Sequence, residues 1–224
     1  MTPDAVEIAE RYASVVERIG VAGGNDVTVI AVTKKHPVAV VAAAVEAGLI
    51  DIGENYAQEL ATKRGEIGGA RWHFIGQLQT NKARLLFPPP DPAEPDALGP
   101  LTIHSVDRNS LVDVIARLHP GAQVLIQVDL SGEPGRGGAA PEQVDALVER
   151  AVSHGLDVLG LMAVAPFGST TQDAAIGFSL VRDLRDKLGL RELSMGMSGD
   201  FEVAVAEGAT MVRIGTAIFG SRQR

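Results

Sequence analysis

The apolar residues of this chain fall into short β-branched runs that alternate with stretches of helical spacing. The first run, Val27 to Val32, has the composition of a fully buried strand, and it ends abruptly in Lys34, Lys35 and Pro37. Before it, residues 4–19 repeat apolar side chains close to a helical stripe, and a glycine-rich turn follows. The pattern therefore predicts an opening helix that leads into a first strand.

Further strand-like runs follow along the chain, separated by helical stretches. Strands are expected at 49–55, 71–76, 101–106, 123–130, 156–165, 192–197 and 210–215, and helices at 37–48, 56–63, 80–86, 109–118, 141–153, 174–188 and 200–206. Eight strands alternating with helices is the count of a closed (β/α)₈ barrel. We therefore predict an α/β fold, a single TIM-barrel domain over residues 1–224, with the additional N-terminal helix covering the barrel bottom.

The competing architecture is an open, doubly wound sheet. The first strand is not followed by a Gly-x-Gly-x-x-Gly turn, and short strands are evenly spaced to the end of the chain, so the barrel is favoured. The segment from Pro88 to Pro100 is rich in proline and small or acidic residues. It is interpreted as a loop and not a domain linker, because too little sequence precedes it for a complete domain.

Composition and charge exclude several classes of protein. The hydrophobic share of 46% in 224 residues is ample for a packed core. A net charge of −8, with no basic run longer than two residues, argues against a nucleic-acid-binding surface. The absence of cysteine excludes disulfides, thiolate metal sites and cysteine nucleophiles.

The chain also lacks the sequence marks of export and of several catalytic sites. Its N-terminus does not have the layout of a signal peptide, and no apolar run reaches membrane-spanning length, so we expect a cytoplasmic protein without membrane contact. No zinc-binding His-Glu-x-x-His helix, nucleophile elbow or phosphate-binding P-loop is present. No metal ligand and no catalytic residue is assigned.

The lysine pair after the first strand is the leading candidate for chemistry. Alternation places Lys34 on the face of Ile30 and Val32 and sends Lys35 to the other face. An ammonium held in an apolar pocket loses solvation, which favours the neutral amine, a nucleophile toward an aldehyde. Lys34 is therefore a candidate for a Schiff base, although two lysines that simply cap a strand and extend to water would give the same pattern.

The loops after the last two strands are candidates for an anion site. In barrels of this class such a site often forms after strands seven and eight. Ser198 is placed to cap the helix after the seventh strand, and Gly215 and Thr216 open the loop after the eighth. Backbone N–H groups at helix starts, together with hydroxyls, can hold a phosphate. Ordinary capping and turn chemistry is the alternative for each loop alone.

A reactive amine and a phosphate site together point to pyridoxal 5′-phosphate, which carries both an aldehyde and a phosphate. Arg213 alternates with Met211 and Gly215 and is therefore expected to point inward. An arginine beside the pyridine nitrogen discourages its protonation and weakens the ring as an electron sink. A phosphate contact or a structural ion pair is the other interpretation of Arg213.

Six motifs resemble those of a known family, in the same order and nearly from end to end. The stretches AVTKKHP, GENYAQE, WHFIGQLQTNK, GLMAVAP, LSMGMSGDFEVAVAEG and MVRIGTAIFG are similar to the YggS/PROSC family, the pyridoxal phosphate homeostasis proteins related to the barrel domain of alanine racemase. The resemblance implies that Lys34 forms the Schiff base, that Asn55 lies beside the ring and that Arg213 faces the pyridine nitrogen. It also implies a phosphate and cofactor site made of Ser194, Met195, Ser198, Gly215 and Thr216 with nearby backbone.

The same resemblance covers the third strand and the start of its helix. His73, with Gln77, Asn81 and Lys82 behind it, matches the family motif there, which implies a place at the cofactor mouth. The chain departs from the family pattern in two places. Arg136 stands where the family usually has lysine, and the Pro88 to Pro100 insert is longer than expected; both bear on ligand release and partner docking.

Three functions remain open from the sequence. The first is a carrier that binds pyridoxal phosphate and acts in vitamin B6 and amino-acid homeostasis without turnover, with pyridoxal-phosphate-dependent enzymes as candidate clients. The second is a racemase of the same barrel type, which needs a second acid–base group opposite the lysine. Because the eighth predicted strand lies close to Arg224, we expect no further domain to supply that group, and Tyr56 is the tyrosine to test in that role. The third is a lysine-dependent aldolase that acts on phosphorylated sugars without a cofactor.

We expect the protein to be a monomer, because a closed barrel needs no partner to complete its core.

Overall fold

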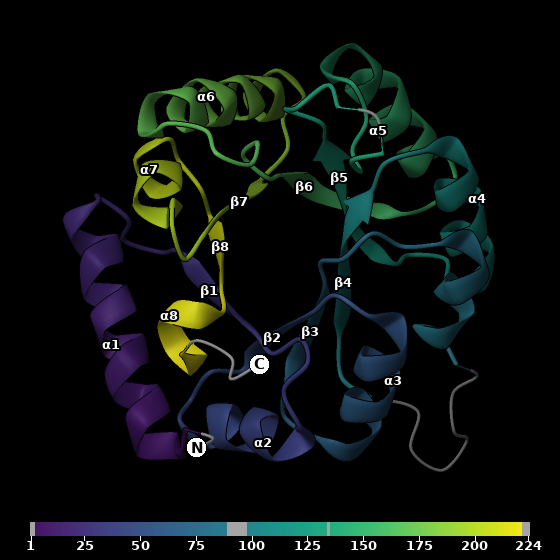
Figure 1. Ribbon diagram of the computed structural model, residues 1–224. Coiled ribbons are helices and arrows are strands. Elements are labelled where there is room, and N and C mark those ends of the chain that lie inside the picture. The colour runs from purple at the N-terminus through teal and green to yellow at the C-terminus, as the bar shows by residue number, and fades with distance from the viewer. Residues whose placement is uncertain (1–2, 89–97, 134, 221–224) are drawn as a thin grey trace.

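The computed structural model describes residues 3–88, 98–133 and 135–220. Within these residues the predicted closed barrel is confirmed, because eight parallel strands pair in sequence order and the last pairs with the first (Figure 1). The strands are β1 (Thr28–Val32), β2 (Asp51–Glu54), β3 (Arg71–Phe74), β4 (Leu101–Val106), β5 (Gln123–Val128), β6 (Asp157–Ala163), β7 (Glu192–Met197) and β8 (Met211–Ile214).

Helices follow the strands as expected, although several of their ends are shifted and two of the expected helical segments contain 3₁₀ structure. They are α1 (Ala5–Val21), α2 (Val38–Glu46), α3 (Ala57–Glu66), α4 (Asn109–Leu118), α5 (Val144–Ser153), α6 (Thr171–Lys187), α7 (Phe201–Ala206) and α8 (Thr216–Phe219). The helix expected at 80–86 is the 3₁₀ helix η1 (Thr80–Leu85), and the one expected from residue 141 begins with a short 3₁₀ turn, η2 (Pro141–Gln143). Of the loop expected between Pro88 and Pro100, residues 89–97 lie outside the described residues.

The N-terminal helix is present, but its predicted position at the barrel bottom is wrong. It lies in the outer layer, where α1 contacts α2, α7 and α8 (Figure 1). Arg18 bonds Glu202 of α7, and Arg11 donates to the backbone of Ile218 in α8. The reason is geometric: α8 is a single turn of four residues, so α1 covers the part of the barrel wall that a full-length helix would otherwise cover.

Strand alternation separates an apolar outer face from a largely polar interior. On β3, Trp72 and Phe74 join the main hydrophobic cluster between the strands and the helices, whereas His73 between them makes polar contacts within the barrel. On β8, Val212 and Ile214 join the same cluster. Arg213, between those two, is buried on the interior face, as the alternation predicts. The interior also contains apolar side chains. Ile30 of β1 is fully buried outside the main cluster, and Leu125, Leu159 and Met162 of β5 and β6 form a separate cluster.

The register of the strands aligns the ends that carry the candidate residues. Val32 pairs with Gly53 on one side of β1, and Ile30 pairs with Arg213 on the other. The residues that follow β1, β2 and β8 therefore lie at one mouth of the barrel. None of the described helices combines the length and the apolar character needed to cross a bilayer.

Candidate functional site

Lys34 lies in the turn that leaves β1, at the carboxyl end of the barrel strands. It is half-buried, whereas Lys35 is exposed and has a left-handed backbone with φ of 61°. The backbone on both sides of Lys34 is fixed by α3. The carbonyl of Thr33 accepts from Lys63 Nζ at 2.9 Å, and the amide of Lys35 donates to Glu59 Oε2 at 2.7 Å. The turn that carries the candidate amine is therefore held at its two ends.

A buried ion pair lies beneath this turn. Lys63 Nζ is 2.6 Å from Glu54 Oε1, and their side chains are 5% and 0% exposed. The hydroxyl of Thr33 donates to the same carboxylate oxygen at 2.6 Å. Burial raises the pKa of Glu54 above its usual value, and the hydrogen bonds from Lys63 and Thr33 offset only part of that rise. The pair links the end of β2, helix α3 and the Lys34 turn into one unit.

Asn55 follows β2 at the same mouth, and its backbone is in close contact with Gly76. A Cβ added to Gly76 would lie 2.1 Å from the Asn55 carbonyl oxygen, so only glycine allows this approach. The side-chain oxygen of Asn55 is buried and has no hydrogen-bond partner among the described residues. A buried amide oxygen without a partner costs free energy, and a polar ligand group at the mouth would remove that cost.

The loops after β7 and β8 meet through one hydrogen bond. The backbone amide of Ala217, in the first turn of α8, donates to Ser198 Oγ at 3.3 Å. The prediction that Ser198 caps the helix after β7 is therefore wrong. Asp200 occupies the position before α7 and accepts from the amide of Met197 at 2.6 Å, which leaves Ser198 on the α8 side. Ser198, Gly215 and Thr216 thus lie together at the carboxyl end of the barrel.

Arg213 is buried inside the barrel with its guanidinium bonded on two sides. Its Nη1 donates at 2.6 Å both to the carbonyl and to the hydroxyl of Ser194, and its Nη2 donates to the carbonyl of Ala163 at 2.8 Å. Burial lowers the pKa of Arg213 to about 10, and the charge of Asp200 acts in the opposite direction. The group is therefore charged at neutral pH. The Ser194 hydroxyl is engaged by Arg213 and by His104.

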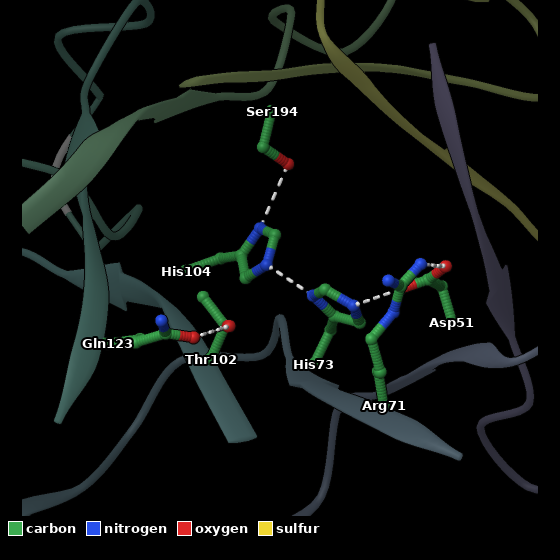
Figure 2. Close-up of polar contacts among 7 residues, drawn as sticks. All are labelled: Asp51, Arg71, His73, Thr102, His104, Gln123 and Ser194. Carbon is green, nitrogen blue, oxygen red and sulfur yellow. Dashed lines mark hydrogen bonds and ion pairs between the residues drawn. The ribbon is translucent and has the colours of Figure 1, made fainter. Parts of the chain in front are cut away.

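A chain of polar side chains continues from Ser194 through the barrel (Figure 2). His104 Nδ1 lies 2.9 Å from Ser194 Oγ, and its Nε2 lies 2.9 Å from His73 Nδ1. His73 Nε2 is 3.0 Å from Asp51 Oδ1, and Arg71 also donates to that carboxylate. Burial would raise the pKa of Asp51, but hydrogen bonds from His73 and Arg71 outweigh burial and lower it. Within the described ranges, no three His, Asp or Glu side chains are grouped to hold a metal.

The other candidate residues lie in different environments. Met195 is fully buried in the main hydrophobic cluster on the outer face of β7, so its side chain points away from Ser194. His73 lies inside the barrel, with both ring nitrogens engaged. Gln77 and Asn81 are exposed, Lys82 is half-buried, and Tyr56 is 44% exposed with Lys35 Nζ over its ring. Arg136 lines a cavity of about 440 Å³ beside Met197 and Gly199. Lys34 and Asn55 do not line it, so we do not identify this cavity as the main site.

Sequence patterns do not reveal two pairs of polar residues inside and around the barrel, Asp51 with His104 and Glu54 with Lys63. No motif marks Asp51 or His104, although alternation places Asp51 on the same face as Gly53 and Asn55. Glu54 and Lys63 fit the patterns of a strand end and a helix, and these patterns do not indicate the ion pair between them. An acidic residue at the start of a strand that is otherwise buried was the available signal for Asp51.

Known proteins resemble this chain over nearly its whole length. The family model described as alanine racemase, N-terminal domain, matches residues 4–223. The pyridoxal phosphate homeostasis protein of Pseudomonas aeruginosa is 41% identical over 231 residues, covering 96% of each chain. The structure of PipY from Synechococcus elongatus with PLP bound superposes with a TM-score of 0.81 and 34% identity, covering 95% of this chain and 100% of that one. Alanine racemase from Corynebacterium glutamicum, at 17% identity, shares the fold, with a TM-score of 0.74 over 64% of its length.

Proposed function

The chain belongs to the pyridoxal phosphate homeostasis protein family, and on this premise we propose that it binds pyridoxal 5′-phosphate reversibly and acts in vitamin B6 and amino-acid homeostasis without turnover of its own. The observation that supports this most is the grouping at one barrel mouth. Such a cofactor can use the groups found there: a lysine amine, a buried amide oxygen that has no partner among the described residues, two hydroxyl-bearing loops and an internal guanidinium. When bound, the cofactor supplies an aldehyde and an electron-withdrawing ring.

Lys34 is the residue that would hold the cofactor covalently. Its amine attacks the aldehyde carbon, a carbon–nitrogen double bond forms, and the aldehyde oxygen leaves as water, which gives a Schiff base. The hydrogen bonds to Thr33 and Lys35 support this role, because they fix the backbone from which the amine extends. A fixed turn lowers the entropy cost of bringing the amine to the aldehyde.

The phosphate would lie against the loops after β7 and β8. Ser198 and Thr216 offer hydroxyls there, and the backbone around Gly215 offers N–H groups. Ser194 has another role in this proposal, because its hydroxyl is engaged by Arg213 and His104. It holds Arg213, and only through Arg213 does it act on the pyridine ring.

Arg213 would face the pyridine nitrogen and keep it unprotonated. A positive guanidinium near that nitrogen disfavours a second positive charge on the ring, so the ring is a weak electron sink. This supports a carrier over an enzyme that must stabilise a carbanion.

We also propose that the protein is cytoplasmic and a monomer. A mass of one chain in light scattering would support the monomer, and twice that mass would refute it.

The test compares two ligands and one reaction. The purified protein is titrated in a calorimeter with pyridoxal 5′-phosphate and with pyridoxal, which lacks the phosphate. We expect saturable one-site binding of the first and much weaker binding of the second. The loaded protein is then incubated with L-alanine, and D-alanine is followed by chiral chromatography. Absence of binding refutes the proposed function, and D-alanine formation that grows with protein concentration refutes the absence of turnover.

A further inference from the structure

One line of buried polar side chains runs across the barrel interior from Asp51, at the amino end of β2, to Arg213. Figure 2 shows the part of this line from Asp51 to Ser194. Each member is at most 8% exposed; in order they are Asp51, His73, His104, Ser194 and Arg213. The successive contacts are 3.0, 2.9, 2.9 and 2.6 Å long. The members come from β2, β3, β4, β7 and β8, so the line connects strands that are not all neighbours in the sheet.

The chemistry of the two ends gives every hydrogen bond in the line a direction. Asp51 is a carboxylate and only accepts, so His73 must donate to it through Nε2–H. In its neutral form His73 then has Nδ1 as an acceptor, and His104 must donate to it through Nε2–H. His104 is completely buried, and burial holds the pKa of its ring well below the usual value, so this ring is neutral and its Nδ1 accepts.

The hydrogen bonds keep the same direction from His104 through Ser194 to the guanidinium of Arg213. Because His104 Nδ1 accepts, the Ser194 hydroxyl must donate to it, and the Ser194 oxygen is then an acceptor for Arg213. The other contacts of Arg213 are to backbone carbonyls, whose polarity cannot change. Among the described residues, the hydrogen bond to the Ser194 hydroxyl is therefore the contact of Arg213 whose polarity can vary, and the Asp51 carboxylate at the far end of the line sets it.

We propose that Asp51, His73 and His104 are positioning residues of the cofactor site, which fix the Ser194 proton and thereby hold Arg213 where it faces the ring. This inference rests on the proposed function for its link to the cofactor. If the hydrogen bonds of the line had the opposite direction, His104 Nδ1–H would donate to Ser194. The hydroxyl proton of Ser194 would then have no acceptor in the line. The contact with Arg213 would then weaken.

The first test needs no cofactor. Long-range ¹H–¹⁵N spectra of the labelled full chain report which ring nitrogen of each histidine carries the proton, and His73→Asn and His104→Asn variants assign the signals. We expect both rings to be protonated at Nε2 and unprotonated at Nδ1. A proton on His104 Nδ1 in the wild type overturns the proposal. This result stands even if the protein binds no pyridoxal phosphate, an outcome that would refute the proposed function separately.

The second test reverses the line at its far end. Asp51→Asn replaces the carboxylate by an amide that can donate, so the His104 proton is expected to move to Nδ1. The affinity for pyridoxal 5′-phosphate is expected to fall about tenfold, with a shifted near-visible band, because a charge-assisted contact of Arg213 is weakened. Asp51→Glu restores a carboxylate and is expected to recover the wild-type tautomers.

The matched control is Thr102→Val. Thr102 is a buried polar residue on β4 beside the line, but its hydroxyl donates to Gln123 at 3.4 Å and takes no part in it (Figure 2). We expect wild-type tautomers, band and affinity in this variant. Unchanged affinity and band in Asp51→Asn, or equal changes in Thr102→Val, would contradict the positioning role. The wild-type spectrum decides the direction of the line even if Asp51→Asn does not fold.

Discussion

Lys63 Nζ lies 2.6 Å from Glu54 Oε1, in an ion pair that is almost completely buried beneath the turn that carries Lys34. The same ammonium also donates to the carbonyl of Thr33 and contacts Glu59, which accepts from the amide of Lys35. A buried ion pair is not in itself a source of stability, because desolvation offsets much of its attraction. Its position indicates another role: it fixes the backbone on both sides of the candidate nucleophile.

Lys63→Met tests this pair. The variant leaves the Glu54 carboxyl buried without its cation, so we expect the free energy of unfolding in urea to fall by about 3–5 kcal/mol. The matched control is Lys187→Met, which breaks an ion pair with Asp145 whose side chains are 66% and 50% exposed. That change is expected to cost less than about 1 kcal/mol. Equal losses in the two variants would contradict a special role for the buried pair.

Gly76→Ala tests the close approach to Asn55. The added methyl group would overlap the Asn55 carbonyl, so the strand end must shift, and we expect a loss of about 1–3 kcal/mol in stability. The affinity for pyridoxal 5′-phosphate is expected to fall with it. Gly65→Ala in α3 is the control, because a Cβ there meets nothing within 4 Å and stability should rise by up to about 1 kcal/mol. Thermal unfolding of both variants tests whether the change in stability has opposite signs, a loss in Gly76→Ala and a gain in Gly65→Ala.

The phosphate loops are tested by a comparison of ligands. Ser198→Ala and Thr216→Val each remove a hydroxyl from the proposed phosphate site, and a hydrogen bond to a charged group is worth about tenfold in affinity. We expect each variant to bind pyridoxal 5′-phosphate about tenfold more weakly and to bind pyridoxal as the wild type does. Calorimetry with both ligands gives the ratio. An equal loss for the two ligands would show that the hydroxyls do not contact the phosphate.

Asp51 gives the fold a pH dependence of known sign. Its pKa in the folded protein lies below the ordinary value of 3.8, because the hydrogen bonds from His73 and Arg71 outweigh the effect of burial. A depressed carboxyl pKa stabilises the fold above the unfolded value and loses that contribution as pH falls through the folded value. The wild type should therefore exceed Asp51→Asn in unfolding free energy above pH 3.8, by a difference that shrinks at lower pH. A difference that does not change with pH would contradict the assignment.

The barrel could be predicted from the sequence because the pattern that indicates each strand lies within that strand. Alternation on β3 separates Trp72 and Phe74 from His73, and alternation on β8 separates Arg213 from its apolar neighbours. Each strand therefore carries its own assignment of inner and outer faces. The same rule placed Arg213 inside the barrel without any knowledge of its partners.

The rest depends on contacts between distant segments. Lys63 and Glu54 read as an ordinary helix residue and strand residue until α3 is placed over β2, and His104 and Ser194 are 90 residues apart. The position of α1 could not be predicted either, because it depends on how short α8 is in the folded barrel. Ser198 looks like a cap in sequence, but the turn extends to Asp200, and its hydroxyl accepts from α8 instead.

The most direct measurement is the near-visible absorption of the purified protein with pyridoxal 5′-phosphate, for the wild type, Lys34→Ala and Lys35→Ala. Borohydride reduction and peptide mapping then locate the bound cofactor. We expect an imine band in the wild type and in Lys35→Ala, no band in Lys34→Ala, and the reduced adduct on the peptide that contains Lys34. A band that persists in Lys34→Ala, or an adduct on another lysine, would contradict the assignment of Lys34 as the residue that holds the cofactor.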